Sequence, residues 1–312
     1  VEIVQEAQQP RVADQDRQIQ LTVLAGLGGF ACPVALILWW DTRGKRINTP
    51  AEVVRTTGLD LLGTVPLVPA KAAKQLHSEG KRYHHWRAIF TESVRGIAAR
   101  LIRQAKEDET RVVLVTSAFG GEGKTTVASQ LAISLAEMGQ KTILIDFDLR
   151  RPSLDGVFGI ENDRGVSEIL RGEAKWQQVC RDSGIENLDI IPAGQWSYRG
   201  MAVLANGVVG GLFRSLREQY DFVIVDGSPV LPVADTRFVS MHVDGVVMSV
   251  LRDVSRMPKV HAAYRTLAAF DAKILGAIVT GNPGEAYYHD PRYTHYIDAA
   301  DEPEPVSADE TG

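Results

Sequence analysis

Uninterrupted apolar stretches alternate with longer amphipathic ones along most of this chain. The segments "RVVLVTSA" (111–118), "KTILIDFD" (141–148) and "FVIVDGS" (222–228) are almost entirely apolar until they end, which is typical of strands buried on both faces of a sheet. Three further segments have this character: 188–194, 245–252 and 274–281. Helix-length segments separate most of them. The pattern predicts an α/β fold with a mostly parallel sheet and helices on both faces.

Apolar residues recur at intervals of three and four in "WRAIFTESVRGIAARLIRQAKED" (86–108), which predicts an amphipathic helix. A second helix is expected in "KTTVASQLAISLAEM" (124–138), with Gly139 as its stop. We therefore expect the globular domain to occupy residues 86–283.

The stretch "LTVLAGLGGFACPVALILWW" (21–40) contains no charged residue. Twenty helical residues span roughly 30 Å, the thickness of a bilayer core. Trp39 and Trp40 stand where an aromatic belt would lie. The stretch predicts a transmembrane helix. A buried core helix and a signal peptide are the alternatives, but the stretch is apolar on all sides and lacks a basic start.

Four basic residues follow this stretch between Arg43 and Arg55, whereas only Arg11 and Arg17 precede it. The positive-inside rule places the C-terminal side in the cytoplasm. We expect an extracytoplasmic piece at 1–20, a juxtamembrane linker at 41–85 and a cytoplasmic domain at the inner (cell) membrane. Because the chain starts at Val1, we also expect it to be a fragment of a longer protein.

The composition is that of an ordinary globular protein, with 23% charged and 45% hydrophobic residues in a chain of 312. A net charge of -5 gives no indication of nucleic-acid binding. Two cysteines are too few for a disulfide framework or a zinc cluster.

The segment 284–312 is polar, and its last fifteen residues carry acids but neither Lys nor Arg, which predicts disorder. It holds four of the eight tyrosines of the chain. Chance enrichment and anchoring of the segment through aromatic contacts are the simplest explanations. The four are Tyr287, Tyr288, Tyr293 and Tyr296.

The segment "AFGGEGKTT" (118–126) lies between an expected strand and an expected helix, the context of a phosphate-binding loop. Its glycines let backbone N–H groups converge on phosphate oxygens, and the helix N-terminus adds a positive dipole end. Lys124 can reach the β- and γ-phosphates, and the Thr125 hydroxyl can ligate Mg²⁺. The expected nucleotide contacts are Gly120, Gly121, Glu122, Gly123, Lys124, Thr125 and Thr126.

Aspartates end two other expected strands. Asp146 and Asp148 in "ILIDFDLRRP" (143–152) are two positions apart, so on an extended strand they share a face. Asp226 follows four apolar residues in "FVIVDGSP" (222–229), as in a Walker B strand. The carboxyl ends of parallel strands form the ligand-binding edge, which places all three near phosphates and metal.

Together these three motifs resemble the Walker A, Walker A′ and Walker B motifs of bacterial tyrosine kinases, within the wider group of ParA- and MinD-like ATPases. The resemblance covers about residues 86–282. In that family the kinase follows a polysaccharide co-polymerase module with two membrane helices. The stretch 21–40 looks like the second of these helices, and "LDLLGTVP" (59–66) looks like the segment after it.

The resemblance implies ATP- and Mg²⁺-dependent autophosphorylation of the four tail tyrosines, on the same or a neighbouring subunit of a homo-oligomer. It also implies polysaccharide export and polymerase proteins as partners. By the same resemblance, Lys124, Asp146, Asp148 and Asp226 are catalytic, and Thr125, Asp146 and Asp226 surround the metal. Asp146 is the candidate to accept or orient the tyrosine hydroxyl proton.

The sequence departs from the family at several positions. Phe119 replaces the signature lysine of MinD-like ATPases, which favours the kinase branch. The ring-forming helix of the family reads Glu-x-x-Arg-x-x-Arg; Glu92 and Arg95 match it, but Ala98 stands where the second arginine should be. Gly227 and Ser228 replace the Thr-Pro that commonly follows the Walker B aspartate, and Thr280 stands where an Asn often helps to hold the base. The alternatives are an ATP-binding regulatory scaffold without kinase activity and a ParA/MinD-like ATPase.

Overall fold

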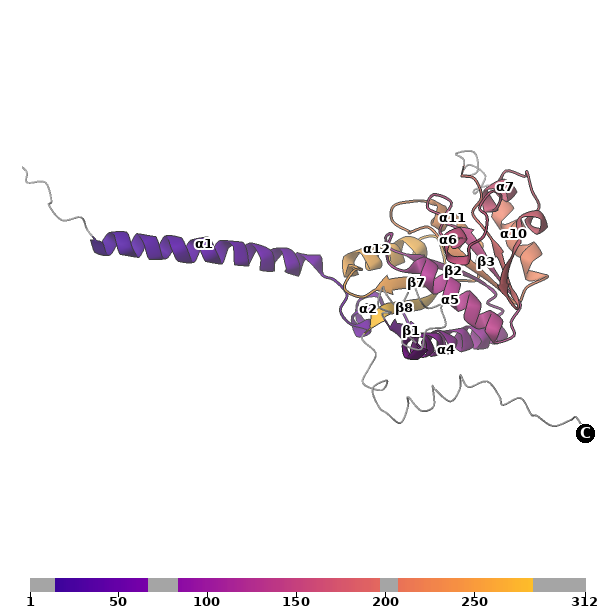
Figure 1. Ribbon diagram of the computed structural model, residues 1–312, viewed down its shortest axis with the longest axis horizontal. Coiled ribbons are helices and arrows are strands. Elements are labelled where there is room, and N and C mark those ends of the chain that lie inside the picture. The colour runs from indigo at the N-terminus through magenta and orange to yellow at the C-terminus, as the bar shows by residue number, and fades with distance from the viewer. Residues whose placement is uncertain (1–14, 67–83, 197–206, 283–312) are drawn as a thin grey trace, which may run out of the picture. The chain divides into compact units, whose positions relative to one another are not determined.

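The computed structural model describes residues 15–66, 84–196 and 207–282. It divides into two units, residues 1–45 and 46–312. The first contains helix α1 (Gln15–Gly44), drawn in indigo in Figure 1. Within α1, residues Gln18–Leu36 have a mean hydropathy of 1.8 and none of their side chains is buried. By length and composition, this segment is sufficient to cross a membrane.

The second unit is built on an eight-stranded sheet with the strand order β1-β8-β7-β2-β6-β3-β5-β4. All neighbouring pairs are parallel except β4 and β5, which are antiparallel. The strands are β1 (Leu61–Pro66), β2 (Val112–Ser117), β3 (Thr142–Phe147), β4 (Arg181–Ile185), β5 (Leu188–Ile191), β6 (Phe222–Gly227), β7 (Gly245–Leu251) and β8 (Ile274–Asn282). The predicted fold class, a mostly parallel sheet, is confirmed.

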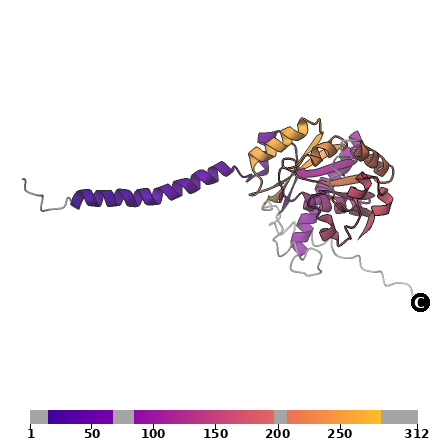
Figure 2. The same cartoon turned by 90° about the horizontal axis from the view of Figure 1, so that it is seen from above.

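Helices cover both faces of the sheet (Figure 2). Helices α4 (His84–Asp108) and α5 (Lys124–Glu137) lie on one face, and the short helix α6 (Leu154–Phe158) contributes Leu154 to the same core. The helices that contribute to the core on the other face are α2 (Pro50–Thr57), α7 (Val166–Leu170), α8 (Trp176–Val179), α10 (Val208–Arg217), α11 (Asp235–Ser240) and α12 (Met257–Ala268).

The central strands supply both hydrophobic cores. In β2, Val112 and Leu114 belong to the core under α10 to α12, whereas Val113 and Val115 belong to the core under α4 and α5. Successive side chains of a strand point to opposite faces, so a strand between two helical layers must be apolar at every position. This is why the sequence of β2 shows no alternation.

The sheet extends further towards the N-terminus than the sequence indicated. Helix α2 and strand β1 lie within 41–85, the segment expected to be a linker, and β1 pairs in parallel with β8. Gly63 in β1 allows Ile97 of α4 to pack directly against the strand, since a Cβ there would lie 2.5 Å from the Ile97 side chain. An edge strand of six residues with a glycine and a terminal proline gives a weak sequence signal.

Candidate functional site: a phosphate-binding loop with three aspartates

The loop between β2 and α5 has the backbone of an anion cradle. Gly121 and Gly123 adopt φ values of 81° and 79°, in the left-handed region that favours glycine. Gly123 is the N-cap of α5, so the first N–H groups of this helix face the loop. Ala118, at the start of the loop, is fully buried and is followed by the glycines that form the turn.

Glu122 lies inside the loop. Its side chain is 3% exposed, and its carboxylate accepts the Phe119 N–H at 2.8 Å. The Ser249 hydroxyl donates to the Glu122 carbonyl at 2.8 Å. Burial raises the pKa of Glu122, while the hydrogen bonds from Phe119 and Ser255 oppose the rise. The Glu122 side chain, expected to contact the nucleotide, is thus turned into the loop and holds the backbone of Phe119.

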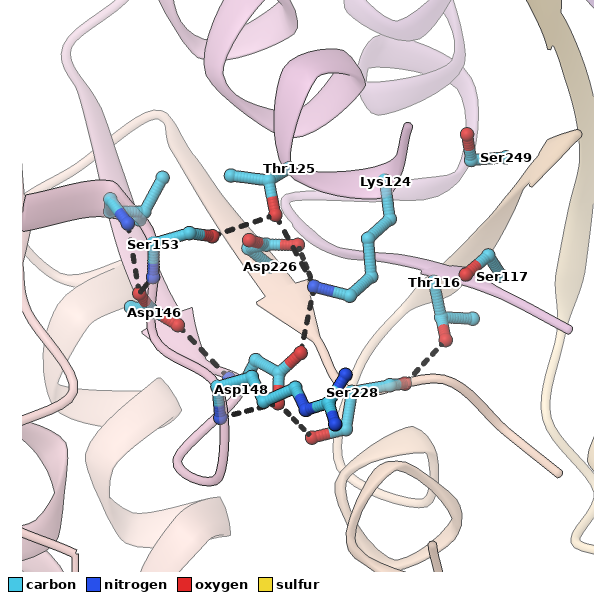
Figure 3. Close-up of polar contacts among 12 residues, drawn as sticks. Thr116, Ser117, Lys124, Thr125, Asp146, Asp148, Ser153, Asp226, Ser228 and Ser249 are labelled. Atoms are coloured by element: carbon cyan, nitrogen blue, oxygen red, sulfur yellow. Dashed lines mark hydrogen bonds and ion pairs between the residues drawn. The ribbon is translucent and has the colours of Figure 1, made fainter. Parts of the chain in front are cut away.

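Lys124, the first residue of α5, lies between two aspartates (Figure 3). Its Nζ is 2.9 Å from Asp148 Oδ2 and 3.5 Å from Asp226 Oδ1. It also donates to the Thr125 hydroxyl at 3.3 Å. Burial alone would lower the pKa of Lys124, but the charges of Asp226 and Asp148 together outweigh it, so the pKa is raised. Lys124 therefore carries its charge at every physiological pH.

Asp146 and Asp148 are two positions apart in the sequence but have different surroundings. Asp146 is fully buried, and its two oxygens accept the backbone N–H groups of Asp148, Ser153 and Leu154 at 3.0–3.1 Å. Burial, and then the charge of Asp226, raise its pKa to about 7 against these hydrogen bonds. Asp148 lies beyond the end of β3, where its carboxylate meets Lys124 and accepts the Ser228 hydroxyl at 3.0 Å.

Asp226 is the penultimate residue of β6 and is also fully buried. Neither of its oxygens accepts a hydrogen bond of ordinary geometry from a described residue, and the Lys124 ammonium lies 3.5 Å from Oδ1. Burial raises its pKa to about 6, although the charge of Lys124 opposes the rise. A buried carboxylate with so little hydrogen bonding is suited to binding a cation.

The oxygen atoms at this point suit Mg²⁺, which prefers carboxylate and hydroxyl ligands together with phosphate and water. Thr125 Oγ1 is 3.1 Å from the Ser153 hydroxyl and within reach of the Lys124 ammonium, beside Asp226 (Figure 3). Within residues 15–66, 84–196 and 207–282, no group of three His, Cys, Asp or Glu side chains forms a complete metal site. A metal ion at this site would accordingly need phosphate oxygens as ligands in addition to the side chains of the protein.

A cleft of about 840 Å³ opens in front of the loop. Its walls come from the loop and α5, from the segment after β3 and from the segment after β6. The lining residues that carry functional groups are Lys124, Thr125, Thr126, Asp148, Arg150, Arg151, Ser153 and Ser228. Asp148 lines this cleft, whereas Asp146 lies behind it.

Ser228, Arg150 and Asp235 complete the polar surroundings of the site; the sequence suggests a phosphate or subunit contact for Arg150 but no role for Asp235. Ser228 binds Asp148 through its hydroxyl, and its carbonyl accepts the Thr116 hydroxyl at 2.8 Å. Arg150, which lines the cleft, forms an ion pair with buried Asp235 at 3.1 Å. Ser228 follows the Walker B strand by one residue, which is a usable signal. Asp235 is distant in the sequence and gives none.

The remaining predicted site residues are Thr280 and the four tail tyrosines. Thr280 lies in β8, and its hydroxyl is buried without a hydrogen-bond partner among the described residues. The predicted acceptors Tyr287, Tyr288, Tyr293 and Tyr296 lie outside the described residues.

This fold and site define a P-loop nucleotide-binding protein in which two further strands bring carboxylates to the loop lysine. Residues 110–252 match a family model described as an AAA domain. The chain is 30% identical to the tyrosine-protein kinase YwqD of Bacillus subtilis over 195 residues, 62% of this chain and 82% of that protein. It belongs to the family of bacterial tyrosine-protein kinases.

Two further similarities define the extent of the match. The succinoglycan biosynthesis transport protein ExoP of Rhizobium meliloti is 26% identical over 89% of this chain, which covers 39% of ExoP. The structure of the kinase domain of the Escherichia coli tyrosine kinase ETK superposes with a TM-score of 0.68 at 26% identity, over 75% of this chain and 94% of that domain. The chain thus spans well under half of a long relative.

Proposed function

We propose that this chain is an ATP- and Mg²⁺-dependent tyrosine autokinase, anchored to the cell membrane by α1, which phosphorylates its own tyrosine tail or that of a neighbouring subunit. The observation that carries the proposal is the placement of Lys124 against Asp148 and Asp226 at the head of the cleft. Lys124 there is charged, nearly buried and aimed where phosphate oxygens would replace the carboxylates as its partners.

In this proposal, the loop N–H groups and Lys124 hold the phosphates, and Thr125 and Asp226 hold the metal. Bound Mg²⁺ would supply charge neutralisation at the transferring phosphoryl group. Asp226 suits this role because its buried oxygens accept no hydrogen bond of ordinary geometry from the described residues.

The geometry favours Asp148 over Asp146 as the group that orients the acceptor hydroxyl. Asp148 lines the cleft, so a tyrosine side chain can approach its carboxylate. Asp146 is held by three backbone N–H groups, which fixes the turn from β3 into α6. We therefore assign Asp146 to holding this turn and the charge balance around the metal, rather than to contacting the tyrosine.

The proposed role in polysaccharide synthesis and the proposed cytoplasmic location are supported by a relative and by the sequence. ExoP is named for succinoglycan biosynthesis and transport, which supports a role in polysaccharide synthesis and export together with polymerase or export proteins. The basic residues after α1 support a cytoplasmic domain.

Incubating the full chain with ATP and Mg²⁺ tests the activity, with intact mass and phosphotyrosine detection as readouts. We expect added phosphate on the wild type and none on Lys124→Met or on the variant with all four tail tyrosines changed to Phe. Phosphate on the tyrosine-free variant would show that the acceptor assignment is wrong.

A second candidate is an ATP-binding scaffold without phosphoryl transfer, and α4 favours it. Glu92 and Arg95 are exposed there, but Ala98 is fully buried, and Arg95 pairs with Glu137 of α5 at 3.2 Å. The surface expected to assemble a ring is accordingly reduced. ATP binding without any phosphotyrosine in the same assay would establish this candidate and exclude the kinase.

A further inference from the structure

A second, smaller cleft of about 230 Å³ lies beside the phosphate-binding loop. Its walls include Phe119 of the loop, Val254 after β7, and Arg256 and Lys259 at the start of α12. Phe119 and Gly120 line both this cleft and the large one, so the two clefts adjoin. A ligand extended along the surface could occupy both.

The charges of the small cleft are unusual for their position. Arg256 is the N-cap of α12 and Lys259 lies in its first turn, where no acidic residue occurs. Cations at the positive end of a helix are unfavourable, and acids are the usual choice there. The arrangement costs stability unless an anion compensates for it.

The described part of the chain supplies no such anion. Arg256 and Lys259 are both exposed, and neither takes part in an ion pair between described residues. Lys259 Nζ lies 5.4 Å from the centre of the Phe119 ring. The carboxylate in the cleft wall, that of Glu122, is buried and bound to the Phe119 N–H. The cleft thus presents two cations and an aromatic ring to the solvent.

The chain itself contains a segment of complementary charge. Residues 284–312 carry eight acids, two histidines and one arginine, Arg292, but no lysine. Three acids lie two positions from a tyrosine: Glu285 before Tyr287, Asp290 after Tyr288 and Asp298 after Tyr296. In an extended segment, such pairs point to the same side about 7 Å apart.

We propose that the small cleft is the docking site for the acidic residues that flank the acceptor tyrosines of the tail, residues 284–312. A tail carboxylate binds Arg256 and Lys259, and the neighbouring tyrosine passes Phe119 into the large cleft towards Asp148. The inference rests on the proposed kinase function and gives it a specificity: tyrosines with an acid two positions away are preferred.

The first test compares kinetics on a peptide of sequence 284–305 supplied to the full chain, whose own tail acids are changed to Asn or Gln to prevent competition. The double variant Arg256→Gln/Lys259→Gln should raise the KM for this peptide about 3- to 10-fold, the range of one or two exposed ion pairs. It should leave kcat and the KM for ATP within about twofold, and extra salt should reduce the difference. Arg265→Gln, an exposed change on the same helix, is the control and should alter nothing.

A peptide with Glu285, Asp290 and Asp298 neutralised supplies the complementary arm. The KM of the wild type for this neutralised peptide should be about 3- to 10-fold higher than for the acidic peptide, and the double variant should show no further rise in KM. If the double variant raised the KM equally for both peptides, the proposal would be overturned. A raised KM for ATP would also overturn it, because it would assign the cleft to the nucleotide.

Binding of a fluorescent peptide with all tyrosines changed to Phe separates this inference from the kinase function. Its affinity needs no phosphoryl transfer, and we expect the double variant to weaken it by the same 3- to 10-fold. Unchanged affinity overturns the docking site even if the chain is an active kinase. Weakened affinity supports it even if phosphate transfer fails.

Discussion

The buried carboxylate of Asp226 leads to a prediction about stability. Burial raises its pKa from 3.8 to about 6 in the folded chain, although the Lys124 ammonium lies 3.5 Å away. Well below pH 3.8, Asp226 is protonated in both the folded and the unfolded state and costs nothing. As the pH rises from about 4 to about 6, the unfolded state ionises Asp226 while the folded state keeps it protonated, so stability falls across this range and is level above it.

The magnitude follows from the shift. About two pKa units correspond to about 3 kcal/mol at pH 8, at about 1.4 kcal/mol per unit. Asp226→Asn removes this cost, and Lys124 keeps Asp148 as a partner at 2.9 Å. The charge of Asp226 also helps to raise the pKa of Asp146, so the variant relieves that group as well. We expect the nucleotide-free variant to unfold about 5–10 °C above wild type at pH 8.

Thermal unfolding of the full chain in detergent, followed by near-UV circular dichroism at pH 5 and pH 8, measures the effect. The gain should be about half as large at pH 5, because the unfolded state is already ionised there while the folded state is still mostly protonated. Asp60→Asn, an exposed change, serves as the control and should give little change at either pH. A loss of stability at pH 8, or an equal gain at both pH values, would refute the reasoning.

Three further predictions concern other parts of the molecule. Lys124→Met should abolish tyrosine phosphorylation and also lower the unfolding temperature at pH 8, because Asp148 loses its ion pair; intact mass and melting curves check both effects. Gly165→Ala should cost about 3 kcal/mol in urea unfolding, since its Cβ would lie 1.9 Å from the Pro192 carbonyl oxygen. Gly63→Val should destabilise the sheet edge by a similar amount in the same assay, because Ile97 fills that space; wild-type stability in either glycine variant would contradict the packing.

The central part of the fold could be predicted from the sequence because it is apolar on both faces. Strands β2, β3 and β6 each have six buried positions, so no alternation obscures them. Once these strands are located, the sequence also places the phosphate-binding loop after β2 and the aspartates at the carboxyl ends of β3 and β6. Strand β4 was missed because its sequence, "RDSGI", has no buried position. Its pairing with β5 depends on tertiary contacts that local patterning does not encode.

The different surroundings of Asp146 and Asp148 could not be predicted either. A spacing of two implies a shared face only while the chain remains extended. Strand β3 ends at Phe147, so Asp148 already belongs to the following turn. The turn directs the backbone N–H groups of Ser153 and Leu154 onto Asp146, and these donors are invisible in a pattern of side chains.

The position of β1 determines which shortened versions of this protein remain soluble. A chain begun at residue 86, where the sequence suggests that the domain starts, would lack β1 and leave one side of β8 without backbone partners. Strand β8 is nine residues long and mostly apolar, and an uncovered strand of that kind recruits other chains into intermolecular sheets. A chain begun at residue 46 keeps both β1 and the hydrogen bond from the Ile47 N–H to the Ser255 carbonyl at 3.0 Å. The former should aggregate on refolding, and the latter should remain monodisperse.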